Sequence, residues 1–405
     1  MALSEPNTRL WTRPFVALTI SSFLLFLNLQ MLLSSFPAYV KDTFHVGDLT
    51  VSLVTSLFAL AAIATRFATA ALMRRFSRTG LLYLGLAIAG LVTGLYVAAD
   101  SIGSLLLMRV GYGIGFGMAS TIIPTLVSQI IPIGRMGEGI GYFGLSTSLA
   151  MSVGPMIGLN VMKQAGFPPL AYAGTAAVLL AIPTLLLSRA VPPAPARPKP
   201  SAGEEGAAHP FNVKLAFPAL LNVLLAVTYS GLLSFIALFG ASVHLEQVGL
   251  FFLFNAVTIV VIRPISGRVF DRHGHAAVLV PAALCVLASL LVLSYTTTTA
   301  TLIVSALLYG LGFGAIQPTI QAWMLRASAP EQHGMANSMF YNSTDLGVAA
   351  GAMMLGGIAS MTGYAQLYRY SAGFMVLFLF LYGLVRWISA GRVRREAEAI
   401  AAVQD

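Results

Sequence analysis

The stretch Gly113-Ile-Gly-Phe-Gly117 returns almost unchanged as Gly310-Leu-Gly-Phe-Gly314, 197 residues later. Each copy lies inside a long apolar run, at 103–130 and at 301–326. Glycine has no side chain, so repeated glycines in a helix allow a neighbouring helix to come close. The two copies therefore predict a duplicated unit of closely packed, membrane-spanning helices.

The same offset recurs along the chain. It joins three further pairs: Arg66 with Arg263, Gly137 with Gly334, and Gly154 with Gly351. Gap-free coincidences over such a distance indicate that one half of the chain repeats the other. Parallel repeats in a membrane protein imply a substrate site near the midplane, between the two halves.

The composition excludes the soluble classes of protein. Of the 405 residues, 57% are hydrophobic and 9% are charged, and the mean hydropathy is +0.83. A soluble domain carries about 25% charged residues, so this chain has too few to cover a soluble globule. A soluble enzyme, a nucleic-acid-binding protein and a disordered protein are excluded. The composition predicts an all-α integral membrane protein. We also expect that the chain is not an enzyme.

Twelve apolar runs are long enough to cross a bilayer, which takes ~20 apolar residues per helix. We expect helices at 14–40, 49–73, 80–99, 103–130, 139–163, 170–188, 215–241, 249–268, 276–296, 301–326, 335–360 and 367–389. A segment rich in proline and charge separates the sixth run from the seventh. The predicted organisation is a six-helix bundle over 1–188, a solvated linker over 189–214 and a second six-helix bundle with a short tail over 215–405.

Basic residues indicate the orientation. The chain has 23 Lys and Arg against 14 Asp and Glu, a net charge of +9. With the N-terminus inside, the only basic residues left in the outer loops are Lys41, Lys163 and Arg369. Cytoplasmic loops collect Lys and Arg, so we expect a multi-pass protein of the cell membrane with both termini and the linker in the cytoplasm. The apolar stretch from Pro14 to Phe36 lacks a cleavage site, which indicates an uncleaved first helix.

A loop motif after the eighth run makes the chain similar to a known family. Gly267-Arg-Val-Phe-Asp271-Arg272-His-Gly274 matches the pattern Gly-x-x-x-Asp-Arg-x-Gly of the major facilitator superfamily. That family carries the pattern after its second helix and often again after its eighth. The first copy is degraded here, because its Gly, Asp and second Gly are replaced by Ala70, Arg74 and Ser77. The resemblance, with six plus six helices, covers essentially the whole chain.

Two more motifs resemble the drug/proton antiporter branch of that family. Arg109-Val-Gly-Tyr-Gly113-Ile-Gly115-Phe-Gly117 is similar to the signature of proton-coupled members in the fourth helix. Gly154-Pro155-Met-Ile-Gly158 is similar to the Gly-Pro motif of the fifth helix, with Leu159 in place of a final glycine. The resemblance implies alternating access and a hinge or gate at Gly154, Pro155 and Gly158. Tight helix packing around a proline bend is the alternative.

Asp345 is the carboxylate placed deepest in the predicted membrane region. Together with Ser338, Tyr341 and Asn342 it lies at positions i, i+3, i+4 and i+7, on one face of a helix. A charge in the bilayer centre costs roughly 3 kcal/mol on translocon scales, so such residues usually have a task. We expect Asp345 to carry a proton or to couple a cation, with a purely structural pairing as the alternative.

Arg109 is the matching buried cation. Arginine does not lose its proton in proteins, so Arg109 could act only by modulating Asp345 across the two halves. We hypothesise that the side chains of Arg109 and Asp345 meet between the two halves. The alternative is that Arg109 bonds backbone carbonyl groups.

Uncharged polar residues are the candidates for the substrate cavity. They are Asn28, Tyr229, Asn255, Gln317, Gln321, Tyr341 and Asn342. Such groups can bind polar parts of a substrate without requiring a charge, and hydrogen bonds between helices are the alternative for each. Many drug antiporters have an acidic residue in the first helix, and Asn28 stands at that place here, which argues against strongly cationic substrates.

The intact loop motif is expected to hold helix ends together. Asp271 can pair with Arg272 or Arg268 and cap a helix N-terminus. In the family the first copy latches the outward-facing state, so Arg74 in its acidic position should weaken that latch. Glu138 is a possible new partner for Arg74 and Arg75.

We therefore predict a proton-coupled secondary transporter that exports a small amphipathic molecule, a drug-like compound or a metabolite, by alternating access. Export of a sugar or a metal-chelating opine, proton symport for uptake, and a membrane sensor without transport are the alternatives. The expected partners are the substrate, protons and the lipid bilayer, and the chain is expected to act as a monomer. Scattered histidines and the lack of a phosphate-binding loop predict neither a metal nor another cofactor, and no nucleic acid.

Overall fold

The computed structural model describes residues 9–46, 48–73, 75–189, 213–245 and 247–404. They form twelve α-helices: α1 (Arg13–Phe44), α2 (Asp48–Leu72), α3 (Arg78–Leu95), α4 (Ile102–Ile130), α5 (Met136–Ala165), α6 (Phe167–Leu187), α7 (Ala216–Ser242), α8 (Gly249–His273), α9 (Ala276–Ser294), α10 (Thr299–Arg326), α11 (His333–Thr362) and α12 (Tyr364–Gln404). Short 3-10 helices stand at Tyr96–Ala98, Ile133–Arg135, Val213–Leu215 and Pro330–Gln332.

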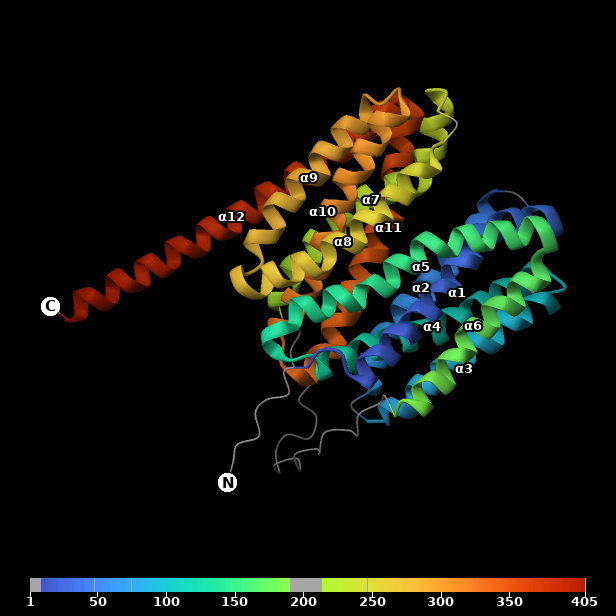
Figure 1. The fold of residues 1–405 in the computed structure, drawn as a ribbon, viewed down its shortest axis with the longest axis horizontal. Helices are drawn as coiled ribbons and strands as arrows, with labels where there is room; N and C mark the ends of the chain where they lie inside the picture. The colour runs from blue at the N-terminus through green and yellow to red at the C-terminus, as the bar shows by residue number, and fades with distance from the viewer. Residues whose placement is uncertain (1–8, 47, 74, 190–212, 246, 405) are drawn as a thin grey trace.

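The predicted all-α fold of twelve helices is confirmed. The starts of the helices lie within three residues of the expected ones. The end of α12 differs most, because the helix continues to Gln404 and projects from the bundle (Figure 1). Its last stretch is polar but rich in Arg, Glu and Ala, which favour a helix without favouring a membrane. The expected linker falls almost entirely on residues 190–212, outside the described part.

The helices form two six-helix bundles with the same internal packing (Figure 1). In the first half α4 packs on α2 and α3, and α1 packs on α5 and α6. In the second half α10 packs on α8 and α9, and α7 packs on α11 and α12. Each contact of one half thus has its counterpart six helices later, which confirms the repeat read from the sequence.

The repeated glycines make two of these contacts possible. A Cβ atom on Gly113 of α4 would lie 2.8 Å from a backbone oxygen of α2, and one on Gly310 of α10 would lie 2.8 Å from a backbone oxygen of α8. The helix starts repeat as well, since Ser101 and Thr298 form capping boxes at the N-termini of α4 and α10. Both pairs keep the offset of 197 residues.

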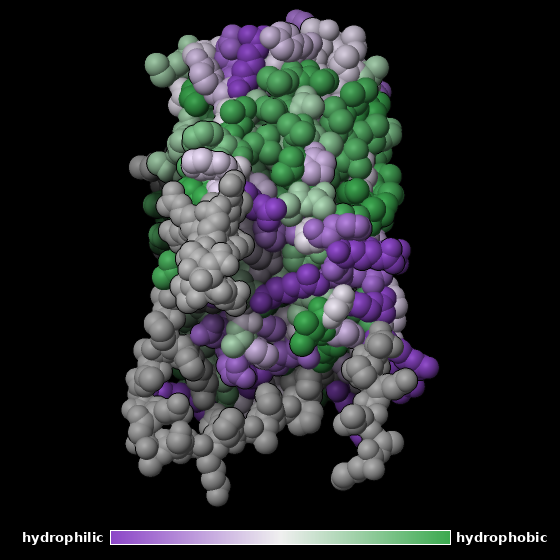
Figure 2. All heavy atoms as spheres, turned by 90° about the vertical axis from the view of Figure 1, so that its left-hand side faces the viewer, coloured by the Kyte–Doolittle hydropathy of each residue, from purple (hydrophilic) through white to green (hydrophobic). Residues whose placement is uncertain are grey.

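The outside of the bundle suits a lipid environment. Ten helices within the described ranges are long and apolar enough to cross a membrane, and α2 adds a shorter apolar stretch, Leu57–Leu72. Large hydrophobic side chains are exposed along several helices, among them Leu91, Leu107, Leu180 and Phe380. Figure 2 shows such side chains as a broad green surface above a band of hydrophilic ones. Lipid would cover the green surface, which is far more apolar than a soluble surface.

The two halves meet at one end of the bundle, which we call the basic end. It is the end at which α5 begins at Met136, α8 ends at His273 and α10 ends at Arg326. There α5 lies against α8, and α11 lies against α2. A Cβ atom on Gly137 of α5 would lie 2.6 Å from the carbonyl oxygen of Gly267 in α8, so the two backbones are in contact. The basic end is therefore closed in this structure.

We expect the Gly267→Ala variant to lose thermal stability. A Cβ atom at this position would lie 2.6 Å from the Gly137 carbonyl carbon and 2.7 Å from the Glu138 Cα atom. Backbone cannot move aside as a flexible side chain can, and overpacking of this kind costs about 1–3 kcal/mol. The measurement is the temperature at which half of the purified protein leaves its gel-filtration peak. Gly383→Ala in α12 is the control, because open space surrounds Gly383. Equal stability of the two variants would contradict close packing at Gly267.

Candidate functional site: an ion pair between the two halves

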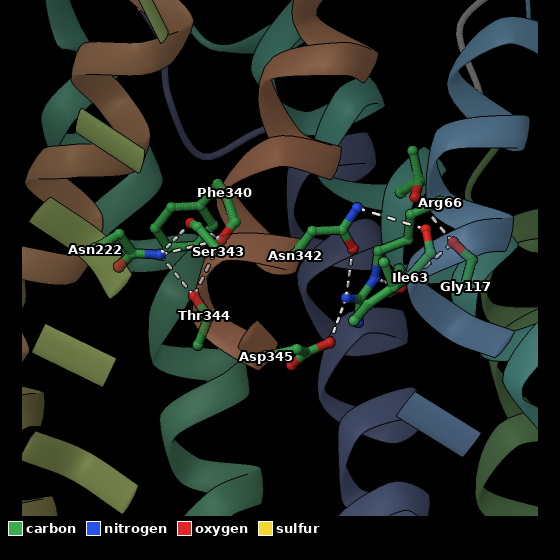
Figure 3. Close-up of polar contacts among 11 residues, drawn as sticks. Ile63, Arg66, Gly117, Asn222, Phe340, Asn342, Ser343, Thr344 and Asp345 are labelled. Atoms are coloured by element: carbon green, nitrogen blue, oxygen red, sulfur yellow. Dashed lines mark hydrogen bonds and ion pairs between the residues drawn. The ribbon is translucent and has the colours of Figure 1, made fainter. Parts of the chain in front are cut away.

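Asp345 of α11 forms an ion pair with Arg66 of α2, and so links the two halves at the closed end (Figure 3). The two side chains differ in their contact with water: 2% of the Arg66 side chain is exposed, against 34% of the Asp345 side chain. The guanidinium is thus enclosed by protein, while about a third of the Asp345 side chain is left uncovered by it.

Arg66 is held by several partners besides Asp345. Its Nε atom donates a hydrogen bond to Ser120 Oγ at 3.2 Å, and its Nη1 atom donates one to Asn342 Oδ1 at 3.1 Å. Aromatic rings flank the guanidinium, with ring centres 5.8 Å away for Phe116 and 5.6 Å away for Tyr341. Buried guanidinium groups need such compensation, because removal from water is costly.

The polar face predicted for α11 lies against α2. Ser338 Oγ donates a hydrogen bond to the Arg66 carbonyl oxygen at 3.1 Å, and Asn342 Nδ2 donates one to the Ile63 carbonyl oxygen at 3.5 Å. On the other side of α11, Asn222 of α7 donates to Ser343 Oγ at 2.8 Å, as Figure 3 shows. The ion pair therefore lies on a helix that is hydrogen-bonded to both halves.

Arg109 lies inside the first half and is not the ionic partner of Asp345, contrary to the hypothesis that the two meet. It is completely buried, and its Nε atom donates a hydrogen bond to the Val54 carbonyl oxygen at 3.0 Å. The rings of Phe36 and Phe58 lie 4.6 Å and 4.9 Å from its guanidinium carbon. Arg109 thus ties α4 to α1 and α2 within the first half, which is the structural alternative stated above.

Sequence reasoning missed Arg66 as the partner of Asp345. Depth alone favoured Arg109, since Arg66 lies nearer the end of its helix. The repeat offered a signal, because Arg66 has a counterpart in Arg263 at the same place in the second half.

The other candidate cavity residues separate into two groups. Asn28 accepts a hydrogen bond from Tyr112 Oη at 2.6 Å, and Gln321 donates one to Asn337 Oδ1 at 2.9 Å, so these two amides connect helices. Tyr229 and Asn255 instead line a cavity between the halves. Gln317 is partly buried on α10.

The cavity lies between α5, α7, α8 and α10. Its lining consists of Ser148, Met151, Tyr229, Phe252, Asn255, Ile259 and Phe313. All of these residues are uncharged and most are apolar or aromatic. The Oδ1 atom of Asn255 is buried without a hydrogen-bond partner among the described residues. In this closed structure the cavity is small, about 20 Å³, which is room for little more than one water molecule. Its lining offers few polar groups.

The loop motif at 267–274 connects α8 to α5 and α10 at the basic end. The ionic partner of its Asp271 differs from the expected ones. Asp271 accepts hydrogen bonds from the backbone N–H groups of Gly137 at 2.9 Å and Glu138 at 3.0 Å, so it caps α5 as predicted. Its ionic partner is Arg326 of α10, and not Arg272 or Arg268. Arg272 is exposed, and Gly274 ends α8 with a φ of +79°, which favours glycine.

Glu138 also has other partners than expected. Its carboxylate accepts hydrogen bonds from Arg135 Nε at 2.8 Å and from Arg268 Nε at 3.0 Å. Arg268 belongs to α8, so Glu138 adds a second charged contact between the halves. The proposed contact with Arg74 falls on a residue outside the described part, and the effect of the degraded first motif on the balance of states stays a prediction.

Gly154, Pro155 and Gly158 lie where α5 packs on α1. A Cβ atom on Gly154 would lie 2.5 Å from the Gln30 Cβ atom, and one on Gly158 would lie 2.9 Å from the Met31 carbonyl carbon. The glycines allow this close approach. A gate at this place stays a prediction. Within the described residues no cluster of His, Cys, Asp and Glu could hold a metal ion.

The model of the Major Facilitator Superfamily matches residues 18–297 and 218–403 of the chain. The chain belongs to this superfamily. The superfamily consists of transporters, so the prediction of a transporter without enzymatic activity is confirmed, as is the membrane-spanning character of the chain.

Known superfamily members are similar along most of their length. The multidrug resistance protein MdtG of Citrobacter koseri is 24% identical over 97% of this chain and 98% of its own. A probable sugar efflux transporter of Helicobacter acinonychis is 23% identical over 78% of this chain and 80% of its own. The solved structure of the human organic anion transporter MFSD10 superposes with a TM-score of 0.76 at 18% identity, covering 93% of this chain and all of that one. This last likeness shows the fold.

We expect the Asp271→Asn variant to open the basic end. The variant loses the charge that pairs with Arg326 and accepts fewer hydrogen bonds at the start of α5, and bonds to charged groups contribute about 1.5–3 kcal/mol each. The measurement is the rate at which N-ethylmaleimide labels a reporter cysteine at position 338, introduced as Ser338→Cys, in purified protein carrying Cys285→Ala. Ser338 is completely buried between the halves, so labelling reports opening.

We expect labelling to become about tenfold faster in Asp271→Asn, since 1.4 kcal/mol corresponds to a factor of ten in an equilibrium. Asp100→Asn is the matched control, because Asp100 is exposed between α3 and α4, far along the chain from the motif. An unchanged rate in Asp271→Asn would show that the motif does not hold the closed end.

Proposed function

We propose that this superfamily member is a proton-coupled transporter that exports a small amphipathic molecule by alternating access. The observation that carries the proposal is the ion pair between Arg66 and Asp345. It joins the two halves, and its carboxylate is the more exposed of the two partners, with 34% of the side chain exposed against 2% for Arg66. A group in this position can link a proton to the contact between the halves.

The link follows from elementary electrostatics. Ionised Asp345 attracts Arg66 and favours a closed basic end. Protonation removes the negative charge and leaves the buried Arg66 guanidinium without its counter-charge, which is strongly unfavourable. Separation of α11 from α2 relieves this cost by exposing Arg66 to water. Protonated Asp345 therefore favours an open basic end.

The direction of transport follows from the orientation. The basic end collects Arg residues, and we propose that it faces the cytoplasm, with both termini on that side, in the cell membrane. A proton from outside then reaches Asp345 while the basic end is closed, and leaves into the cytoplasm once that end has opened. Substrate that binds as the proton leaves is carried outward when the ionised Asp345 pairs with Arg66 again. One monomer suffices for this cycle.

The substrate class is argued from the cavity. Tyr229, Phe252 and Phe313 provide aromatic surface, and Asn255 offers a free amide oxygen. This lining suits an amphipathic drug-like compound or metabolite, and the relative MdtG is named a multidrug resistance protein. Export of a sugar or of a metal-chelating opine is the second candidate, and the sugar efflux relative favours it. In this mechanism Arg109 has a structural part in the first half.

The test uses everted membrane vesicles with an imposed inside-acid gradient and a pH-sensitive dye. Lipophilic cations, neutral antibiotics, sugars and amino-acid-derived chelators are added in turn. We expect one class to collapse the gradient in vesicles with the wild-type protein and not in vesicles with Asp345→Asn. The isosteric amide cannot carry a proton, so coupling should fall to the background of empty vesicles.

Asp100→Asn is the control, because it removes an exposed carboxylate without a place in the proposed cycle. A collapse that survives Asp345→Asn would move the carrier to another residue. Substrate-dependent proton flux in the opposite sense would indicate symport, and substrate binding without flux would favour a sensor.

A further inference from the structure

Arg263 of α8 is the counterpart of Arg66, 197 residues later. Both are almost completely buried, with 2% of each residue exposed. Arg66 faces α11 of the other half, and Arg263 faces α5 of the other half, where its carbonyl oxygen would lie 2.7 Å from a Cβ atom on Gly141. The two arginines thus have equivalent places in the fold.

The surroundings of Arg66 and Arg263 differ in one respect: a carboxylate faces Arg66, and none faces Arg263 at the corresponding position. With the same offset, Ser338, Tyr341 and Asp345 of α11 correspond to Gly141, Gly144 and Ser148 of α5. The position that Asp345 occupies opposite Arg66 is therefore occupied by Ser148 on the helix that lies against Arg263. No carboxylate of the described residues forms an ion pair with Arg263, and its Nε atom is buried without a hydrogen-bond partner among them.

Gly144 makes the room for this guanidinium. A Cβ atom on Gly144 would collide with the Nη1 atom of Arg263 and would lie 3.1 Å from its Cζ atom. At the corresponding place on α11, the Tyr341 ring packs on Arg66 instead. A methyl group at position 144 would therefore overlap the Arg263 guanidinium, and the absence of a side chain at Gly144 leaves room for it.

The guanidinium lies next to the cavity between the halves. Ser148 and Ile259 line that cavity, and they stand four residues, about one helical turn, from Gly144 and Arg263 on α5 and α8. The direction of both helices places Arg263 one turn closer to the basic end. Arg263 therefore lies about one helical turn from two of the uncharged residues that line the cavity, on the side of the basic end, and is not itself part of the lining.

We propose that Arg263 binds the anionic group of the transported molecule, a carboxylate on an amphipathic body. An isolated charge is expensive to bury, and a bound carboxylate would supply the counter-charge that Ser148 does not. Guanidinium and carboxylate match in geometry and can form two parallel hydrogen bonds. The aromatic and apolar lining above would hold the rest of the molecule. This inference deepens the proposed function, since it names the substrate class of the same cavity.

The experiment measures binding and needs no proton gradient. Benzoate and benzamide are compared as ligands of purified protein, because they share the ring and differ in one group, an anionic carboxylate against a neutral amide. We expect benzoate to raise the thermal unfolding temperature in a saturable way and benzamide to leave it unchanged. In Arg263→Gln the affinity for benzoate should fall at least tenfold. Arg263→Lys keeps the charge and should retain a weaker response, which controls for folding of the site.

A second variant tests the same idea by gain of a charge. Ser148→Asp places a carboxylate at the position that corresponds to Asp345, so it should pair with Arg263 and abolish the benzoate response. The Asp100→Asn variant should keep that response. The benzoate measurement needs no proton gradient, so a failure of proton coupling and a failure of this assignment appear in different experiments.

Three results would overturn the assignment. They are equal responses to benzoate and benzamide, a benzoate response that persists in Arg263→Gln or in Ser148→Asp, and stabilisation by chloride in place of benzoate. The last result would make Arg263 a site for an inorganic anion.

Discussion

The closed state of this chain depends on an ion pair in which a guanidinium buried between the two halves takes its counter-charge from the other half. Arg66 has 2% of its side chain exposed and takes its counter-charge from Asp345 of the other half. Its Nε and Nη1 atoms also donate hydrogen bonds to Ser120 and Asn342, but both of these acceptors are uncharged and cannot replace the negative charge of Asp345. Contact between the halves and ionisation of one carboxylate are thereby made interdependent.

The two halves share the contacts that determine the helix packing, and they differ in the charged residues that face each other between them. The glycine contacts and the capping boxes recur in both halves with the same offset, because each half must solve the same packing problem. Arg66 and Arg263 also recur, but only Arg66 faces a carboxylate. In a strictly symmetric chain both arginines would be neutralised by the protein itself. In this chain the Arg66–Asp345 ion pair can respond to a proton, and Arg263 has no ionic partner among the described residues.

Much of the fold could be predicted from the sequence, because hydropathy and helix length obey the same physical limit, the thickness of the bilayer. The polar extension of α12 escaped this reasoning, since it is a helix outside the apolar pattern. Within the site, the face of α11 that carries Asp345 and Asn342 was predictable from helical periodicity. The partner of Asp345 was not, because the depth of Arg66 or Arg109 along a helix does not tell which way its side chain points. Arg109 points into the first half, towards Val54 and two phenylalanine rings.

Three carboxylates lie at the closed contact between the halves, and their surroundings assign them different tasks. Asp271 is held by two backbone N–H groups and by Arg326, and Glu138 is held by Arg135 and Arg268. The exposed fractions of these two side chains are 9% and 7%, against 34% for Asp345. A proton carrier must exchange with water, and release of a carboxylate from several donors costs more than release from one. Asp271 and Glu138 are therefore suited to strengthen the closed state, and Asp345 is suited to end it.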